Sequence, residues 1–448
     1  MIRQLLIRSG WARILRLASA PLSFEGGSSE TSTMAQRDSI FAPDRGPAQP
    51  EKRPLTGALL WTMTVASAAA VANIYYNQPL LAEMMRAFHA SPHAIGLVAT
   101  FTQVGYALGL PVFVPFGDFV ERRRLVVLLF LAEGCSLIAA ALAQNLIWFI
   151  VASLFVGFTS IIPQIMIPLA AELTTPEEQG RTIGRILSGI LLGILLARTV
   201  SGVLGGYLGW RVIYWAAAVM ALVFACLLRV QLPPVPGHAG IVYRELMQSI
   251  WRLALEVPKL RQVSLVAAMF FACFTAFWTT LVFLLETPPY HYGSQAAGLF
   301  GLVGAAGVAV APIAGRLADQ RSPRFVVGIA IFVVLAAFGI FWLFGFHLWG
   351  LVLGVVLLDA GVQAAQVANQ SRVFRLLPHA RNRANTVYMI SYFGGGSLGS
   401  LFGSWSWSHW HWHGVCAIGV ALILIAGGTF LWRGPEAETA VADERLAG

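Results

Sequence analysis

The chain has 448 residues, of which 57% are apolar and 11% are charged, and its mean hydropathy is +0.71. A soluble protein carries about a quarter of its residues as charged side chains, so these values exclude a soluble globular protein. The net charge of +9 comes almost wholly from arginine. A basic balance can indicate nucleic-acid binding, but these arginines fall in loops between apolar segments and so indicate membrane topology.

The first 54 residues differ in kind from the rest of the chain. They are rich in Ser, Gly, Pro and charge, and they begin with MIRQLLIRSGWARILRLA, an arginine-bearing amphipathic stretch without acids. This stretch is similar to a transit peptide. The alternative is that translation starts at Met34 and that 1-54 is a disordered cytoplasmic tail or a gene-model artefact. No function is assigned to this segment.

Apolar segments of about 20 residues, enough to cross roughly 30 Å of hydrocarbon, recur from Gly57 to Trp432. Such segments are too long and too uniformly apolar for barrel strands, and lipid requires every backbone group to be bonded internally. The fold class is therefore an all-α polytopic membrane protein. We predict twelve transmembrane helices, at about 57-79, 94-116, 125-143, 146-172, 182-206, 211-230, 263-286, 296-316, 325-345, 349-374, 384-405 and 413-432.

Basic residues gather in alternate loops, at Arg122 to Arg124, Arg181, Arg244 to Arg261, Arg321 to Arg324, and Arg375 to Arg383. The positive-inside rule then predicts that both termini and the 231-260 connector face the cytoplasm. This connector joins a Pro-rich stretch to an amphipathic helix, YRELMQSIWRLALEV. It divides the chain into an N-terminal half (55-230), a linker (231-262), a C-terminal half (263-433) and a cytoplasmic tail (434-448).

An internal repeat supports this division. Asp118 follows the second span and Asp319 the eighth, about two hundred residues later, and each is followed by arginines. Arg181 and Arg383, before spans five and eleven, are separated by nearly the same interval. Two pseudo-symmetric six-helix bundles explain the repeat.

These loops resemble those of the major facilitator superfamily, whose cytoplasmic signature runs Gly, three residues, Asp-Arg, one residue, Gly-Arg-Arg. Three positions of the first copy match it: Asp118, Arg122 and Arg123. Three depart from it: Val114, Phe119 and Glu121. The second copy has Gly315 and Asp319 in register and ends in Arg324. The resemblance covers about residues 55 to 433 and implies a twelve-span transporter.

An aspartate at a helix end, facing arginines of a short loop, makes charge-assisted contacts that a tilt of one half against the other would break. We therefore expect the motif residues to latch one access state: Asp118, Arg122, Arg123, Gly315, Asp319 and Arg324. The alternative is that the arginines only set the topology. That alternative leaves the repeated aspartate unexplained.

Span five, from Gly189 to Gly206, partly resembles the glycine-rich signature of proton-driven exporters in this superfamily, although Gly202 replaces its usual Pro and Ser201 a usual Gly. Ordinary small-residue packing explains the same glycines. Arg198 is more informative, because a guanidinium in the membrane is costly unless it is paired. It either holds two helices together or lines the pathway.

Span ten carries Asp359, Gln363, Gln366 and Gln370 at spacings that put them on one helix face, which cannot point at lipid. In the superfamily, spans one, four, seven and ten line the central cavity, so the resemblance places this face on the pathway. Burial favours the neutral form of a carboxyl, which makes Asp359 the best candidate for a proton carrier. The alternative is an interhelical polar contact.

Other spans supply candidate solute contacts. Span one has Asn73, Tyr76 and Asn77 on one face, and Pro79 is expected to break its helix near the outer surface. In span four Gln164 lies between two prolines that either bend the helix for gating or form a static kink. The aromatic stripe of span seven, Phe270 to Trp278, is more typical of a core than of a ligand site.

The remaining polar groups suggest no chemistry. Glu133 lies in span three, which is peripheral in the superfamily, so we do not select it for coupling. The four cysteines lie singly in apolar segments. His409, His411 and His413 alternate with tryptophans in what is predicted to be a short outer loop, a pattern typical of an aromatic interface belt rather than of a metal site. We predict no metal, no cofactor and no enzyme activity, and we find no ATP-binding loop.

The predicted function is secondary active transport by alternating access: export of a small organic solute or drug, coupled to protons, across a bacterial inner membrane. Asp359 and Arg198 are the candidates for proton coupling. The solute-cavity candidates are Asn73, Tyr76, Asn77, Gln164, Gln363, Gln366 and Gln370. The expected partners are the lipid bilayer, the solute and protons, with no nucleic acid, and the expected state is a monomer. An uptake carrier or facilitator for a small metabolite is the alternative.

Overall fold

The computed structural model describes residues 55–117, 119–175, 177–235 and 243–432. In these ranges the regular secondary structure is helical and no strand occurs. The helices are α1 (Gly57–Ala72), α2 (Asn77–Ala87), α3 (Pro92–Phe116), α4 (Arg122–Ala141), α5 (Leu146–Thr159), α6 (Ile162–Glu172), α7 (Gln179–Leu208), α8 (Trp210–Gln231), α9 (Tyr243–Glu256), α10 (Pro258–Glu286), α11 (Ser294–Gln320), α12 (Pro323–Phe344), α13 (Leu348–Leu376), η2 (Pro378–Ala380) and α14 (Arg381–Leu431).

Twelve membrane spans account for all the long helices except α9. Within the described ranges, ten stretches are long and apolar enough to cross a membrane, with α1 joined to α2 and α5 to α6. α11 adds another span with its 27 residues. α14 has 51 residues, about twice what a bilayer needs, and a φ of 50° at His411 breaks it into two spans. The predicted all-α, twelve-span fold is confirmed.

Spans one and four are each broken near their middle. α1 ends at Ala72, and α2 begins at Asn77, so Pro79 lies in the first turn of α2. The prediction that Pro79 breaks the helix near the outer surface is therefore wrong. The physical reason is that a proline in a first helical turn needs no backbone N–H partner, and the break precedes it. Pro163 likewise lies in the first turn of α6.

The predicted loop between spans eleven and twelve is also wrong. Helix α14 continues through the Trp- and His-rich segment, and the chain changes direction at His411 alone. Trp412 is buried, and its indole Nε1 donates a hydrogen bond to the carbonyl of Phe341 at 2.9 Å. The chain therefore reverses at a tight kink between two helices rather than in a loop, and residues 408–411 are exposed at this kink.

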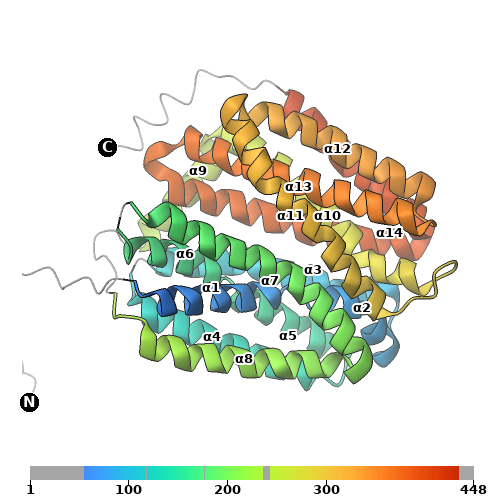
Figure 1. Ribbon diagram of the computed structural model, residues 1–448, viewed down its shortest axis with the longest axis horizontal. Helices are drawn as coiled ribbons and strands as arrows, with labels where there is room; N and C mark the ends of the chain where they lie inside the picture. Colours follow the sequence, from blue (N-terminus) through green and yellow to red (C-terminus); the bar gives the residue numbers. More distant parts are fainter. Residues whose placement is uncertain (1–54, 118, 176, 236–242, 433–448) are drawn as a thin grey trace, which may run out of the picture. The chain divides into compact units, whose positions relative to one another are not determined.

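The spans pack as two groups of helices that follow the two halves of the sequence, blue to green in one group and orange to red in the other (Figure 1). Two helix pairs join the groups: α3 with α14, and α7 with α11. Within the C-terminal half, α10 and α14 approach so closely that a Cβ on Gly395 or Gly399 would collide with the backbone of Ala268 or Ala272. Small residues therefore set the distance between these helices.

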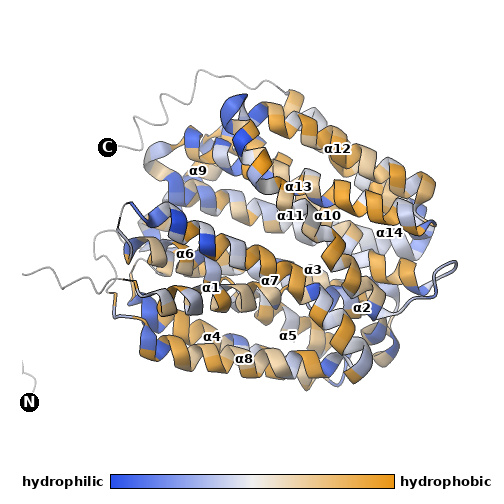
Figure 2. Cartoon of the chain, viewed as in Figure 1, coloured by the Kyte–Doolittle hydropathy of each residue, from blue (hydrophilic) through white to orange (hydrophobic). Residues whose placement is uncertain are grey.

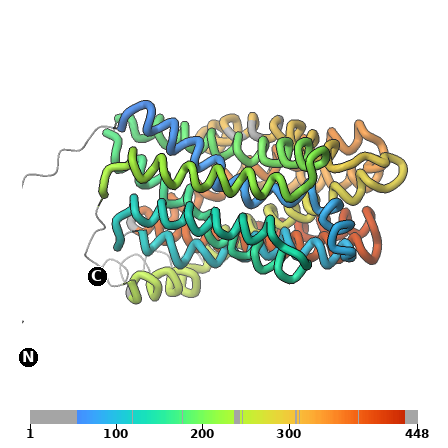
Figure 3. Tube along the Cα trace, turned by 90° about the horizontal axis from the view of Figure 1, so that it is seen from below, coloured from blue at the N-terminus to red at the C-terminus, as the bar shows by residue number. Residues whose placement is uncertain are grey.

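Polar residues concentrate at the ends of the bundle, and apolar residues cover its middle (Figure 2). We call the end that carries Arg122, Arg181, Arg324 and Arg381 the basic end, and the other, with Arg86 and Glu286, the opposite end. The predicted amphipathic connector helix is α9, which lies outside the bundle at the basic end (Figure 3). The predicted tails 1-54 and 434-448 lie outside the described residues.

Candidate functional site

Arg198 of α7 lies fully inside the protein, with 1% of its surface exposed. Its Nε donates a hydrogen bond to Oε1 of Gln78, at 2.8 Å, in the first turn of α2. The guanidinium carbon lies 4.0 Å from the ring centre of Trp278, 4.9 Å from that of Tyr75 and 5.0 Å from that of Phe274. Arg198 and Tyr75 come from the N-terminal half, whereas Phe274 and Trp278 come from α10. Aromatic rings of both halves therefore hold this cation.

Asp359 of α13 is buried, and the indole Nε1 of Trp278 donates a hydrogen bond to its Oδ1 at 3.2 Å. Asp359 packs directly against α11, so that a Cβ on Gly304 or Gly307 would collide with it. The indole of Trp278 thus touches both charged groups, Arg198 with its ring face and Asp359 with its N–H. A cation of one half and an acid of the other meet on one side chain.

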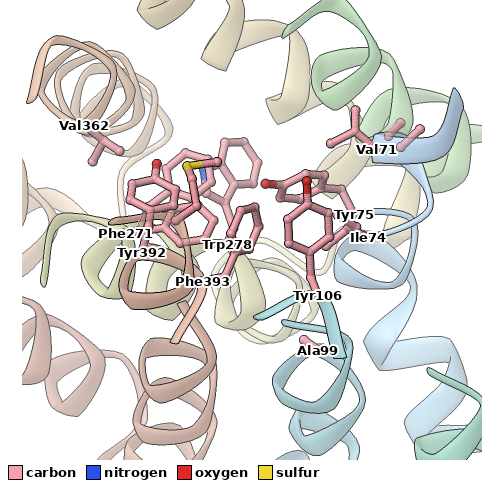
Figure 4. Close-up of a cluster of buried hydrophobic side chains, with 14 of the residues drawn as sticks. Val71, Ile74, Tyr75, Ala99, Tyr106, Phe271, Trp278, Val362, Tyr392 and Phe393 are labelled. Carbon is pink, nitrogen blue, oxygen red and sulfur yellow. The ribbon is translucent and has the colours of Figure 1, made fainter. Parts of the chain in front are cut away.

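Aromatic side chains from both halves surround this centre. In Figure 4 Tyr75 and Tyr106 face Trp278 and Phe393 across the boundary between the halves. The rings of Tyr106 and Phe393 lie 4.0 Å apart between centres, and those of Phe271 and Tyr392 stack at 4.0 Å. Part of the span-seven stripe, Phe274 and Trp278, therefore packs against the charged pair. Their helical spacing alone could not distinguish this position from ordinary core.

Of the solute-cavity candidates of spans one and four, Asn73, Tyr76 and Asn77 are buried and Gln164 is half-buried. The amides among them form hydrogen bonds within the N-terminal half. Asn73 Nδ2 donates to Oε1 of Glu133 at 2.9 Å, and Asn77 Nδ2 donates to Thr102 Oγ1 at 3.1 Å. Gln164 Nε2 donates to the hydroxyl of Tyr106 at 3.2 Å. Tyr76 is buried beside this group. These candidates lie around the breaks of spans one and four.

The candidates of span ten follow one side of α13 from its middle towards the basic end. Gln363 is half-buried, and Gln366 Oε1 accepts a hydrogen bond from the Tyr392 hydroxyl at 3.3 Å. Gln370 Nε2 donates to Asn385 Oδ1 at 3.1 Å. Gln370 also lines an open groove of about 660 Å³ at the basic end, with Leu187 of α7 on its other side.

The described candidate latch residues lie at the basic end, and the ion pairs they form there with other described residues lie within one half. Asp118 lies outside the described residues. Arg122 forms an ion pair with Glu172, and Arg123 forms one with Glu121 at 2.9 Å. In the second copy the partner of Asp319 is Arg375, at 3.1 Å.

The other members of the second copy make different contacts. Arg324 donates a hydrogen bond to the carbonyl of Phe430 at 3.2 Å. Its guanidinium carbon also lies 4.9 Å from the ring centre of that residue. A Cβ on Gly315 would meet Val367 of α13 at 3.9 Å, an ordinary contact. The second copy therefore ties the ends of α11 and α12 to α13 and α14.

No sequence pattern predicted an ion pair at the opposite end. Arg86 at the end of α2 binds Glu286 at the end of α10, with 2.6 Å between Nη1 and Oε2. The two residues lie 200 positions apart, and no local pattern connects them. This pair joins the two halves where α2, α10 and α11 pack together. The groove lies at the basic end, so the halves contact each other at one end and leave a groove at the other.

The geometry agrees with comparisons to known proteins. A sequence model of the Major Facilitator Superfamily matches residues 63–400. YgaY of Escherichia coli strain K12, named as a transporter, is 38% identical over 380 residues, which cover 85% of this chain and 96% of that protein. A protein of Helicobacter pylori strain G27, named "Probable sugar efflux transporter", is 26% identical over 356 residues, covering 78% of this chain and 88% of that one.

A solved structure shares the fold. The bacterial homologue of the human lysosomal transporter Spinster, in an inward-facing and unoccupied conformation, gives a TM-score of 0.64 at 15% identity. The match covers 89% of this chain and 96% of that chain. With the family match and the arrangement of the twelve spans, the conclusion is that this chain belongs to the Major Facilitator Superfamily and is a multi-pass membrane transporter of that family.

Proposed function

We propose that this protein exports a small organic solute in exchange for protons, by alternating access of one central site to the two sides of the membrane. The observation that carries the proposal is the double contact of Trp278. Its ring face lies against Arg198, and its Nε1–H donates a hydrogen bond to Asp359. The two charges belong to opposite halves, so their attraction depends on how the halves are placed. A proton on Asp359 would remove one of the charges and so change that dependence.

In the proposed cycle the proton enters from the side of the opposite end, after the halves have separated there and solute has left. When Asp359 binds a proton, its attraction to Arg198 weakens, because a neutral carboxyl has no net charge to offer the guanidinium. The halves can then tilt back, so that the Arg86–Glu286 pair forms and the latch contacts at the basic end rearrange. Release of the proton at the basic end restores ionised Asp359 and its attraction to Arg198, and solute binds next.

The charge asymmetry is one support for export as the direction. Under the positive-inside rule the basic end, with both termini, faces the cytoplasm of a bacterial cell. The groove that Gln370 lines would then receive solute from the cytoplasm. The name of the H. pylori relative, a sugar efflux transporter, supports export as the direction.

The solute class follows from the residues proposed to contact it. Gln363, Gln366 and Gln370 offer amide donors and acceptors along α13, and Tyr392 and Phe271 offer aromatic faces nearby. Amides recognise hydroxyl and carbonyl groups without requiring a charge. A neutral, hydroxyl-bearing solute with one apolar face therefore fits best, with Asn73, Tyr76, Asn77 and Gln164 completing the site after the halves tilt.

Everted membrane vesicles test this function. An imposed outward-directed proton gradient across the everted membrane, acid inside, should drive solute accumulation by the wild type. Asp359→Asn should lose this accumulation and keep solute–solute counterflow, because exchange of solute alone needs no net proton movement. Glu256→Gln, which removes an exposed carboxylate from α9, is the matched control and should keep both activities.

Accumulation by Asp359→Asn at the wild-type level would exclude Asp359 from coupling. Accumulation only in right-side-out vesicles would show uptake instead of export. Counterflow without any response to a proton gradient, in the wild type itself, would show a facilitator.

A further inference from the structure

A second carboxyl is buried in the N-terminal half, outside the cycle proposed above. Glu133 of α4 has 0% of its surface exposed. Its Oε1 lies 2.9 Å from Asn73 Nδ2 and 2.6 Å from Ser160 Oγ. Its Oε2 is buried without a hydrogen-bond partner among the described residues. α4 is a peripheral helix, but this side chain points inward, so the position of the span did not predict its environment.

The two partners of Glu133 mark the breaks of the two discontinuous spans. Asn73 is the C-cap of α1, directly before the turn that leads to α2. Ser160 is the C-cap of α5, directly before the turn that leads to α6. One carboxyl therefore contacts the interruption of span one and the interruption of span four. In the C-terminal half the corresponding spans, α10 and α13, are continuous helices of 29 residues each.

The hydrogen bonds around Glu133 lack one hydrogen when the carboxyl is ionised. Ser160 Oγ lies within bonding distance of Glu133 Oε1 and also of the carbonyl of Val156, at 2.7 Å, but a hydroxyl has a single hydrogen to donate. Asn73 Oδ1 is a further buried acceptor without a partner among the described residues. A proton on Glu133 supplies the missing donor, towards Ser160 from Oε1 or towards an acceptor near Oε2.

The surroundings of Glu133 contain no compensating charge. The titratable groups that interact with it are the phenols of Tyr76, at the start of α2, and Tyr106 of α3. From α8, Ala218 and Leu222 pack beside the adjacent Gly134. Within the described part of the chain no arginine, lysine or histidine acts on this carboxyl. An isolated ion in such a setting is unfavourable, whereas a neutral acid with hydrogen-bond partners is not.

We propose that Glu133 is a second proton-binding site, in the half that lacks Asp359, and that its proton sets the geometry of the breaks in spans one and four. The neutral acid donates to Ser160 Oγ, whose own hydrogen then bonds the carbonyl of Val156, and it accepts from Asn73 Nδ2, so it holds the two breaks together. Loss of the proton leaves the carboxylate and the Val156 carbonyl to share the single hydrogen of the Ser160 hydroxyl, and the breaks loosen. This site does not depend on the direction of transport or on the solute.

Infrared difference spectroscopy of the purified protein between about pH 6, where exposed carboxyls are already ionised, and about pH 10 tests proton binding directly. The background is Asp359→Asn, which removes the other buried acid. A carbonyl stretch of a neutral carboxylic acid should be present at low pH, shift in D2O and disappear as pH rises. Addition of Glu133→Gln should abolish this band. The control is Glu121→Gln, which makes the same change on an ion-paired glutamate next to the same helix and should leave the band unchanged.

Hydrogen exchange at the breaks tests the structural consequence. After correction for intrinsic rates, amides of residues 73–76 and 160–162 should exchange faster at high pH than at low pH in the wild type. Glu133→Gln mimics the neutral acid, so it should lose this pH dependence and keep the slow rates throughout. If Glu133→Gln does not fold, Ser160→Ala should shift the frequency of the infrared band without removing it.

Two results would overturn the proposal. One is a neutral-acid band that survives Glu133→Gln, or that no pH produces in the Asp359→Asn background. The other is exchange at the two breaks that is independent of pH in the wild type. Neither result bears on Asp359, so the two proposals fail separately.

Discussion

The two halves of the molecule place a buried acid in different settings. In the C-terminal half, Asp359 lies on a continuous helix and contacts Trp278, whose ring covers the cation Arg198 of the other half. In the N-terminal half, Glu133 contacts the breaks of two helices of its own half and, among the residues that the structure describes, meets no cation there. An acid that faces an opposite charge across the boundary can sense the position of the halves. An acid enclosed within one half can change only the shape of that half.

The largest expected effect comes from separating the two charges that meet on Trp278. Arg198→Leu leaves Asp359 buried without its cation, and loss of one member of a buried pair costs about 3–5 kcal/mol. We expect a strongly lowered melting temperature and a transport rate reduced by at least about 100-fold. The double variant Arg198→Leu/Asp359→Asn should regain most of the melting temperature and no proton-driven transport. Equal stability of the two variants would contradict an interaction between the charges.

Trp278→Phe should have the next largest effect. The ring face over Arg198 remains, but the hydrogen bond to Asp359 is lost, and such bonds to charged groups contribute about 1.5–3 kcal/mol. We expect proton-driven transport to fall by about tenfold. Trp412→Phe is the matched control, because it also loses one buried indole hydrogen bond, to Phe341, away from both charges. Similar melting temperatures with a transport defect in Trp278→Phe alone would support the assignment, and equal transport rates would contradict it.

The third prediction concerns the close contact of α10 and α14 in the C-terminal half. Gly395→Ala forces a Cβ into the backbone of Ala268, and overpacking of this kind costs about 1–3 kcal/mol. The adjacent Gly394 has open space, so Gly394→Ala should leave the melting temperature unchanged. Thermal unfolding of the two purified variants makes the comparison. Because alanine favours a helix more than glycine does, a similar decrease in both would show that the interhelical distance does not set the effect.

The smallest effect is expected at the opposite end. Arg86 and Glu286 are partly exposed, and such pairs contribute about 0.2–1 kcal/mol. Arg86→Glu should therefore move the population of the two access states by no more than a few fold, towards separation of α2 and α10. Distances between spin labels at the ends of these helices measure the shift. The exchange Arg86→Glu/Glu286→Arg should restore it, and a failure to restore it would exclude direct attraction as the cause.

Periodicity and charge sufficed to predict the all-α fold and to select Arg198 and Asp359. Both residues are ionisable groups within long apolar segments, which lipid does not tolerate without a partner. Their meeting place could not be predicted, since Trp278 and Gln78 are ordinary residues until the helices pack. Glu133 was set aside because its span is peripheral. The rotation of a helix about its axis decides which way a side chain points. The sequence of an apolar span without a clear polar face does not determine that rotation.

The positions of the breaks in spans one and four could not be predicted from the sequence either. Prolines at positions 79 and 163 suggested interruptions, but both lie in the first turn of the following helix. The breaks fall at Asn73 and Ser160, where side chains bond to a carboxyl of another span. Contacts between distant segments fix these positions, and no local pattern carries that information.

Solute-driven proton movement in proteoliposomes that contain a pH-sensitive dye tests most directly whether Asp359 couples solute transport to protons. Neutral hydroxyl-bearing solutes should be compared with cationic and anionic amphiphiles, using the wild type, Asp359→Asn and Glu256→Gln. We expect proton movement with the wild type and with Glu256→Gln. We expect none with Asp359→Asn, which should retain counterflow. Undiminished proton movement by Asp359→Asn would contradict this expectation.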